Sequence, residues 1–218
     1  IQSITRERQG LQDRVRTEIA SSWGPEQIIA GPVLTIPYKN KFVSKDVSQY
    51  HKLHLLPEKV DITVDLDSEE RSKSIYSTIL YKAKHQMNVL FKMPDRLAFG
   101  SDVEEILWQN ASVDIGFSSA SSLADIVMLE WEKTALKMKS GASDTQLFSS
   151  AIHAYVDVSP EKQVYEMVVN FQILGSKAIH YKPSGNNTTV TMNSDWNSPG
   201  FMGLPLPLKH KISEEGFH

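Results

Sequence analysis

The side chains best able to do chemistry in this chain are its 7 histidines and 26 acidic residues. Only His51 and His54 lie close together, and residues three apart on a strand point to opposite faces. No carboxylate stands at a metal-ligand spacing beside them, which favours surface or packing roles over a metal site. The run from Asp65 begins like a calcium loop, but Glu70 and Tyr76 replace the Gly and Glu that such a loop requires. That run therefore predicts a charged hairpin turn, and we expect no metal.

Enzyme signatures are missing from the sequence. It contains no nucleophile elbow, no phosphate-binding glycine loop and no His-Glu-x-x-His. Cysteine is absent, which excludes disulfides, thiolate zinc sites and a cysteine nucleophile. We therefore expect no catalytic residue and no cofactor. Two carboxylates brought together by the fold, as in a glycosidase, remain an open alternative.

Charge and hydropathy argue against a nucleic-acid-binding surface and against a membrane-spanning helix within these residues. Lys and Arg number 23 against 26 Asp and Glu, so the formal net charge is -3, and neither sign forms a long block. A nucleic-acid surface needs clustered basic residues, so we expect no nucleic-acid partner. The longest apolar run, from Ile28 to Pro37, is broken by Gly31 and Pro32 and is too short for a membrane helix. This leaves open whether a membrane-spanning helix precedes Ile1.

The first 24 residues have the pattern of an amphipathic helix. Leu11, Val15, Ile19 and Trp23 recur every fourth position among charged residues, which predicts a narrow apolar stripe. Gly24 and Pro25 then end the helix, because Gly caps a C-terminus and Pro cannot continue it.

From residue 25 to 218 the hydrophobic period is two, which predicts one β-rich domain, or two packed sub-sheets. Residues 59–66 alternate strictly, and residues 75–93 keep one parity over a length that suits one long twisted strand or two joined strands. Further strands are expected at 125–139, 150–158, 163–174 and 186–194. The fold class is therefore mainly β, with a large antiparallel sheet or sandwich and an N-terminal helix.

Two segments show irregular strand patterns. Apolar parity slips between Trp131 and Leu136, which predicts a β-bulge or bend, while Trp131 itself is expected in the core. Pro32 interrupts the first strand, and because Pro belongs at a sheet edge or a bulge, residues 33–38 are expected near the rim of the sheet.

Four stretches together resemble one family: "SSWGPEQIIAGPVLTIPY" (21–38), "LLPEKVDITVDLDSEERSKSIYSTILYKA" (55–83), "YKPSGNNTTVTMNSDWNSPGFMGLPLP" (181–207) and the closing "EEGF". They are similar to the inner membrane protein CreD family of bacteria. The resemblance implies one membrane helix before Ile1, a large periplasmic domain and further membrane helices after it. Residues 1–24 would then be a stalk helix leaving the membrane, and 25–218 a periplasmic domain at the bacterial inner membrane.

The resemblance also implies a role in envelope integrity, stress responses and colicin tolerance, with no established reaction or ligand. Four residues in the best-matching stretches are candidates for interaction with a partner: Arg71, Tyr76, Asp195 and Trp196. Trp196 precedes Pro199 and Gly200 and is expected at a loop, where an indole can stack on a ligand. A buried arginine network or a tryptophan corner is the structural alternative for these residues.

Three functions follow from these observations. The first is a non-catalytic domain that binds an envelope glycan, another envelope component or a membrane-protein partner. The second is a carboxylate-dependent enzyme acting on glycan or peptidoglycan, which requires a cleft with two carboxylates about 5 to 9.5 Å apart. The third is a structural spacer that positions membrane segments and has no apolar pocket.

Overall fold

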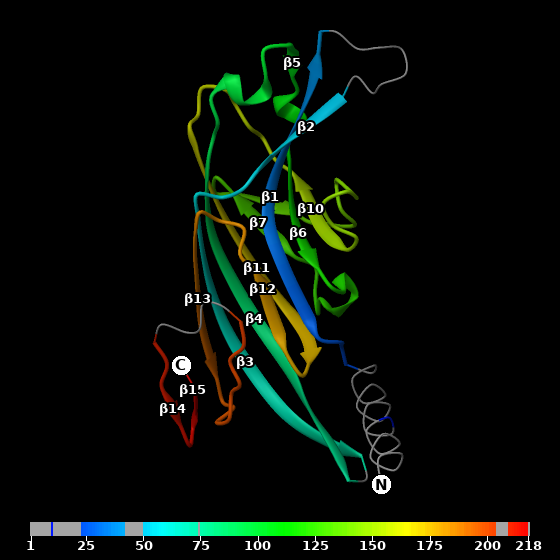
Figure 1. Ribbon diagram of the computed structural model, residues 1–218, viewed down its shortest axis with the longest axis vertical. Helices are drawn as coiled ribbons and strands as arrows, with labels where there is room; N and C mark the ends of the chain where they lie inside the picture. Colours follow the sequence, from blue (N-terminus) through cyan, green and yellow to red (C-terminus); the bar gives the residue numbers. More distant parts are fainter. Residues whose placement is uncertain (1–9, 11–22, 42–49, 74, 204–208, 218) are drawn as a thin grey trace.

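The structure, a computed structural model, describes residues 10, 23–41, 50–73, 75–203 and 209–217, without the side chains of residues 73 and 76. It is a β-sandwich of two large sheets, as the hydrophobic period predicts (Figure 1). The helix expected over residues 1–24 falls on residues 1–9 and 11–22, which lie outside the described residues. Among the described residues, no helix is long and apolar enough to cross a membrane.

The first sheet, sheet A, is built around β1, which pairs along its length with four other strands. Seven described strands form sheet A, in the order β12 (Ile179–Lys182), β1 (Gln27–Asn40), β6 (Ser112–Phe117), β10 (Ala151–Tyr155) and β9 (Lys139–Ser140), with β2 (Tyr50–Leu55) and β5 (Val103–Ile106) also on β1. Three 3-10 turns lie in the connections on either side of β5 and after β6: η1 (Arg96–Phe99), η2 (Trp108–Asn110) and η3 (Ala120–Ser122).

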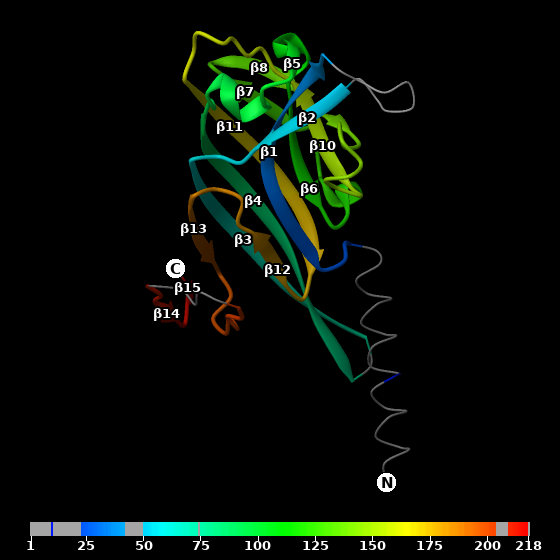
Figure 2. The ribbon, with the colours of Figure 1, turned by 45° about the horizontal axis from the view of Figure 1, so that its top comes forward.

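The second sheet, sheet B, is built on a hairpin of two very long strands. Its eight described strands run in the order β14 (Ile212–Ser213), β15 (Gly216–Phe217), β13 (Asn187–Ser194), β3 (Lys59–Lys73), β4 (Tyr76–Lys92), β11 (Val164–Ser176), β7 (Met128–Trp131) and β8 (Thr134–Lys137). Pairing is antiparallel except between β1 and β12 and between β3 and β13. The tip of the β3–β4 hairpin projects beyond the other labelled strands (Figures 1 and 2).

The period-two patterns place the core between the sheets. Val60, Ile62 and Val64 on β3 are buried, and β4 is one continuous strand with Met87 and Phe91 fully buried, so both predictions are confirmed. The inward residues of sheet A, including Leu34 and Val113, pack into the same cluster. Burial of aliphatic side chains of this size contributes roughly 1.5 to 3 kcal/mol each, which is why one face of each strand is apolar.

The prediction for residues 33–38 is half wrong. β1 is bulged between Ala30 and Val33, so Pro32 does sit at a bulge. However, β1 is a central strand with partners on both sides, and Leu34 and Ile36 are completely buried rather than near a rim. A bulge leaves the proline nitrogen out of the ladder, so the strand needs no open edge to accept it.

The irregularity between Trp131 and Leu136, predicted as a β-bulge or bend within one strand, is a complete hairpin turn between two strands. The chain turns back there, so β7 and β8 form a hairpin with Trp131 opposite Thr134. The two turn residues, Glu132 and Lys133, have φ values of 51° and 67°. Two consecutive positive φ values are what a tight two-residue hairpin requires. Trp131 itself is core, as predicted, at 3% exposure.

Candidate functional site

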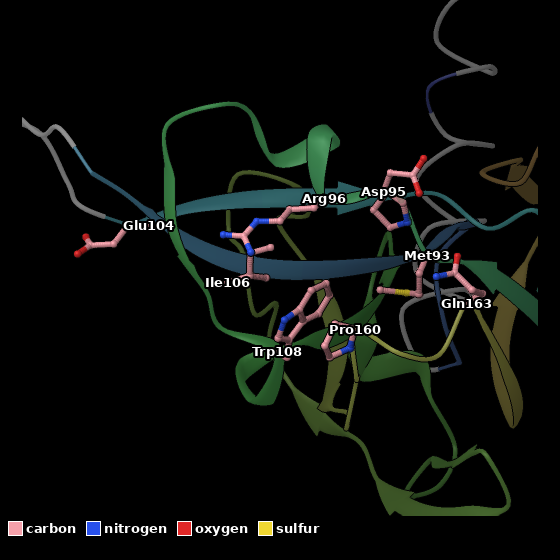
Figure 3. Close-up of a pocket in the computed structure, with 9 residues that line it drawn as sticks. Met93, Asp95, Arg96, Glu104, Ile106, Trp108, Pro160 and Gln163 are labelled. Atoms are coloured by element: carbon pink, nitrogen blue, oxygen red, sulfur yellow. The ribbon is translucent and has the colours of Figure 1, made fainter.

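An open pocket of about 310 Å³ lies at the end of the sandwich opposite the β3–β4 hairpin tip (Figures 1 and 3). It forms where the end of β4, the turns η1 and η2, and β5 meet the loop before β11. Its lining residues are Met93, Pro94, Asp95, Arg96, Glu104, Ile106, Trp108, Pro160 and Gln163. The pocket has the mixed apolar and polar lining that is usual for a small-ligand or peptide site.

Aromatic packing fixes one wall of this pocket. The Trp108 ring meets Phe99 edge-on at a centroid distance of 5.7 Å, and Phe99 meets Tyr38 edge-on at 5.6 Å. Phe99 is 4% exposed, so Trp108 rests on the hydrophobic core rather than on solvent. The opposite wall is tied to sheet B, because the Met93 amide donates to the Gln163 carbonyl at 2.8 Å. Edge-on ring pairs of this kind hold an indole in one orientation.

The polar groups of the pocket are spread along it. The Arg96 side chain extends toward Ile106, while Asp95 and Glu104 lie at opposite ends of the group (Figure 3). Arg96 forms no hydrogen bond or ion pair with any residue that the structure describes. An unpaired guanidinium beside an indole and apolar side chains suits a ligand that combines a carboxylate or phosphate with a flat or apolar group.

A second group of polar side chains lies on the outer face of sheet A, beneath residues 141–150. Asp114 on β6 is completely buried and accepts hydrogen bonds from the Ser143 amide, at 2.6 Å, and from the Ser143 hydroxyl. Ser112 donates to the Ser143 hydroxyl at 2.8 Å. The ring of Phe148 covers Gly116 so closely that a Cβ there would clash with it. These contacts pin the segment to the sheet.

Asp144 links the same segment to β2. Its carboxylate lies 3.0 Å from Lys52 Nζ and 3.5 Å from His54 Nε2. Burial alone would raise the pKa of Asp144, but hydrogen bonds from the Gln146 amide and Lys52, with the charges of Lys52 and His54, hold it below its usual value. Burial lowers the pKa of His54, although Asp144 opposes that shift.

The outer-face cluster does not have the geometry of a nucleophile and base. The described contacts of Ser143 are with Ser112 and Asp114, whereas His54 contacts Thr35 and Asp144. A serine nucleophile needs an imidazole within hydrogen-bond reach, so this cluster is structural. In the described part of the chain, no group of three His, Cys, Asp or Glu side chains could hold a metal ion. His51 and His54 do point to opposite faces of β2, since only His51 stacks on Tyr38.

The structure places Arg71 beside Trp23, and it does not line the pocket. Its guanidinium lies over the Trp23 ring at 5.2 Å and donates to Glu69 at 3.0 Å. Lys82 lies over the same ring at 5.4 Å, and the Trp23 indole donates to the Tyr81 carbonyl at 3.0 Å. The hydrogen bond from Arg71 lowers the pKa of Glu69. We call Trp23, Arg71, Tyr81 and Lys82 the Trp23 joint.

The other three candidate residues lie at two places on sheet B. Asp195 follows β13 and accepts hydrogen bonds from the Ser68 amide, at 3.0 Å, and hydroxyl, at 2.8 Å, so it fastens the end of β13 to β3. Trp196 is half-buried, and its indole donates to the Ser198 carbonyl at 2.7 Å. Tyr76 begins β4, opposite Lys73, and its side chain lies outside the description. None of the four candidates lines the pocket.

Sequence reasoning missed the pocket residues, because Arg96, Trp108 and Pro160 come from separate segments that carry no motif. The one local signal was the run "MPDRLAF" (93–99), which follows the end of β4 at Lys92 and carries Arg96 after a proline.

Comparison with known proteins decides the family. The family model described as "Inner membrane protein CreD" matches residues 1–218. The chain belongs to the CreD family. Inner membrane protein CreD of Escherichia coli (strain K12) is 24% identical over 218 residues, which cover 96% of this chain and 47% of the relative. The chain thus spans about half the length of that CreD protein. No solved structure matches.

Membership of the CreD family makes this a chain of an inner membrane protein, and the family is not named as an enzyme. The resemblance noted in the sequence is confirmed. The described residues of this CreD member contain no helix that could span a bilayer.

Proposed function

We propose that this chain is a non-catalytic domain on the periplasmic side of the inner membrane. It binds an envelope component or a protein partner and so contributes to envelope integrity and to tolerance of stress and colicins. The observation that carries the proposal is the pocket, where Arg96, which has no partner in the described part of the chain, lies beside Trp108 and Ile106. An arginine beside a half-buried aromatic side chain is a combination found at recognition sites.

The distribution of carboxylates in the pocket favours binding over glycan hydrolysis. A glycosidase needs two carboxylates facing the same bond across the substrate. Asp95 and Glu104 instead lie at opposite ends of the pocket residues (Figure 3). The pocket also argues against a purely structural spacer, which has no use for an open site of about 310 Å³.

The test is thermal unfolding of the chain against purified muropeptides, lipopolysaccharide and uncharged glycans. A ligand at about 100 times its Kd stabilises the native state by about 2.7 kcal/mol. For a chain of this size that is a rise in Tm of roughly 5 to 10 °C. Arg96→Gln removes one charge-assisted contact, so the Kd should weaken about 10- to 100-fold.

Lys137→Gln is the matched control, because Lys137 is an exposed cation on β8 that does not line the pocket. A shift that survives Arg96→Gln but disappears in Lys137→Gln would contradict the assignment of the pocket. Cleavage of a muropeptide by the wild-type chain would replace the proposal with the enzyme hypothesis. The absence of any shift, together with failure to crosslink a partner in membranes, would leave the spacer hypothesis.

A further inference from the structure

β5 lines the pocket and is covered by a described strand on one edge only. It pairs with β1, from Tyr38 opposite Ile106 to Asn40 opposite Val103, and has no second strand partner in the part of the chain that the structure describes. Two of its four residues, Glu104 and Ile106, line the pocket. An open edge of sheet A therefore borders the pocket.

The hydrogen bonds to β1 decide which backbone groups of β5 face outward. The Leu107 amide donates to the Pro37 carbonyl at 2.9 Å. In an antiparallel ladder this bond makes the adjacent residues, Ile106 and Tyr38, a pair that is not hydrogen-bonded. The amide and carbonyl of Ile106 thus point away from β1, and no described residue bonds to either of them. Such an edge is a template for another strand.

The side chains of the pocket complement one face of an extended peptide. Alternate residues of a strand share a face, so two peptide side chains two positions apart can both enter the pocket. One meets the apolar surface of Ile106 and Trp108, and the other meets Arg96, which extends toward Ile106 (Figure 3). A guanidinium is the best side-chain partner for a carboxylate. The fitting peptide therefore has an apolar residue and an acidic residue two positions apart.

Asp95 and Glu104 affect the residues that flank this pair. Both side chains are exposed, and they lie at opposite ends of the pocket residues (Figure 3). Like charges facing each other are unfavourable, so lysine or arginine is preferred at either end of the peptide. Leu97, the residue after Arg96, is 86% exposed and adds apolar surface next to the pocket.

We infer that the pocket binds an extended peptide segment, which adds as a strand to the open edge of β5. Its apolar side chain packs on Ile106 and Trp108, and its side-chain carboxylate pairs with Arg96. In this mode of recognition the main-chain hydrogen bonds supply affinity and the alternate side chains supply specificity. The inference rests on the proposed binding function and names the class of partner, a polypeptide.

Calorimetric titration of the chain with short peptides tests the ligand class. The peptides carry valine, leucine or phenylalanine, then threonine, then glutamate, between lysines at the two ends. Acetylated and amidated ends leave the glutamate as the only carboxylate. Replacing it by glutamine should weaken the Kd about 10-fold or more, and so should Arg96→Gln. The two changes together should add little further loss, because both remove the same ion pair. Lys137→Gln should bind like the wild type.

Methylation of single peptide amides tests the strand pairing. Along a strand paired on one edge, only alternate N–H groups point toward the partner. N-methylation of the tightest-binding peptide should therefore weaken the Kd about 10-fold at alternate amides and leave the amides between them unaffected. On the protein side, Ile106→Pro loses the outward amide, whereas Ile106→Ala keeps it and controls for the shortened side chain. Binding should be weaker to Ile106→Pro than to Ile106→Ala.

The outcomes separate this inference from the proposed function. A muropeptide or lipopolysaccharide that raises the Tm of the wild type but not of Arg96→Gln, while no peptide of the set binds, would support the binding function and overturn the strand addition. Equal effects of methylation at all amides, or equal peptide binding by the wild type and Arg96→Gln, would also overturn it. If no ligand of either kind binds in a way that depends on Arg96, both proposals are wrong.

Discussion

His85 should make the stability of this domain depend on pH between 7.5 and 5. The side chain is 3% exposed on β4 and stacks on Phe171 with ring centroids 4.5 Å apart. Its Nε2 lies 2.7 Å from the hydroxyl of Tyr181, on sheet A, so it joins the two sheets. Burial lowers the pKa of His85 from 6.5 to about 4, although a hydrogen bond with the Ala83 carbonyl opposes the shift.

The direction of this pH effect on the free energy of unfolding depends on which state, folded or unfolded, binds the proton. Between pH 6.5 and about 4 the unfolded chain protonates this histidine while the folded chain keeps it neutral. The unfolded state therefore binds more protons, and the free energy of unfolding falls as the pH falls. A shift of this size corresponds to a limit of roughly 3 kcal/mol, of which about 2 kcal/mol should be lost between pH 7.5 and pH 5.

Urea unfolding at the two pH values measures the loss in the wild-type chain and in His85→Gln. Gln can keep a hydrogen bond to Tyr181 but does not titrate, so the variant should lose about 2 kcal/mol less than the wild type over this interval. Each protein is compared with itself at the two pH values, so the effect of the substitution on stability at a single pH cancels. If His85→Gln does not fold, His85→Asn replaces it as the variant without a titrating side chain. His210→Gln, on an exposed segment, is the matched control. Equal losses in wild type and His85→Gln would refute the reasoning.

Two further substitutions test the contacts that position the ends of the sheets. Gly24→Ala should destabilise the fold by about 1 to 3 kcal/mol in urea unfolding, since its Cβ would lie 2.5 Å from the Leu174 carbonyl oxygen. Gly200→Ala is the control and should be neutral, because a Cβ there meets no atom within 4 Å. Similar losses in both variants would show that packing at Gly24 is not the cause. Asp114→Ala should lower the free energy of unfolding by about 2 to 4 kcal/mol and speed proteolysis of residues 141–150, because the Ser143 amide and hydroxyl lose their acceptor. A variant as stable as the wild type, with residues 141–150 uncut, would contradict the role of Asp114 in holding this segment.

Much of sheet B could be predicted because its faces differ in polarity. Val60, Ile62 and Val64 alternate with polar residues, and one buried face with one solvated face is what creates that pattern. The β7–β8 hairpin could not be predicted from the sequence, because its turn uses Glu132 and Lys133 at positive φ. Gly or Asn at those positions would have indicated a turn.

Sheet A was harder to predict for a related reason. Every residue of β6 is buried, since residues 141–150 cover its outer face, so the strand shows no alternation and Asp114 looks like an ordinary surface residue in the sequence. The pocket depends on contacts between segments far apart in sequence, which no local pattern encodes. Arg71 and Asp195 were predicted as interaction candidates, and in the structure Arg71 contacts Trp23 and Glu69 while Asp195 accepts from Ser68 on β3.

The Trp23 joint has a mechanical consequence. Tension on the chain ahead of Trp23 first meets the indole, held by its bond to the Tyr81 carbonyl and by the cations of Arg71 and Lys82. It next reaches the parallel pair of β1 and β12, from Gln27 opposite Ile179 to Ala30 opposite Lys182. Strands pulled along their own axes are loaded in shear, so their hydrogen bonds must break together rather than one at a time. Force applied ahead of Trp23 would therefore act on this joint and on the β1–β12 pair before it reached the rest of the two sheets.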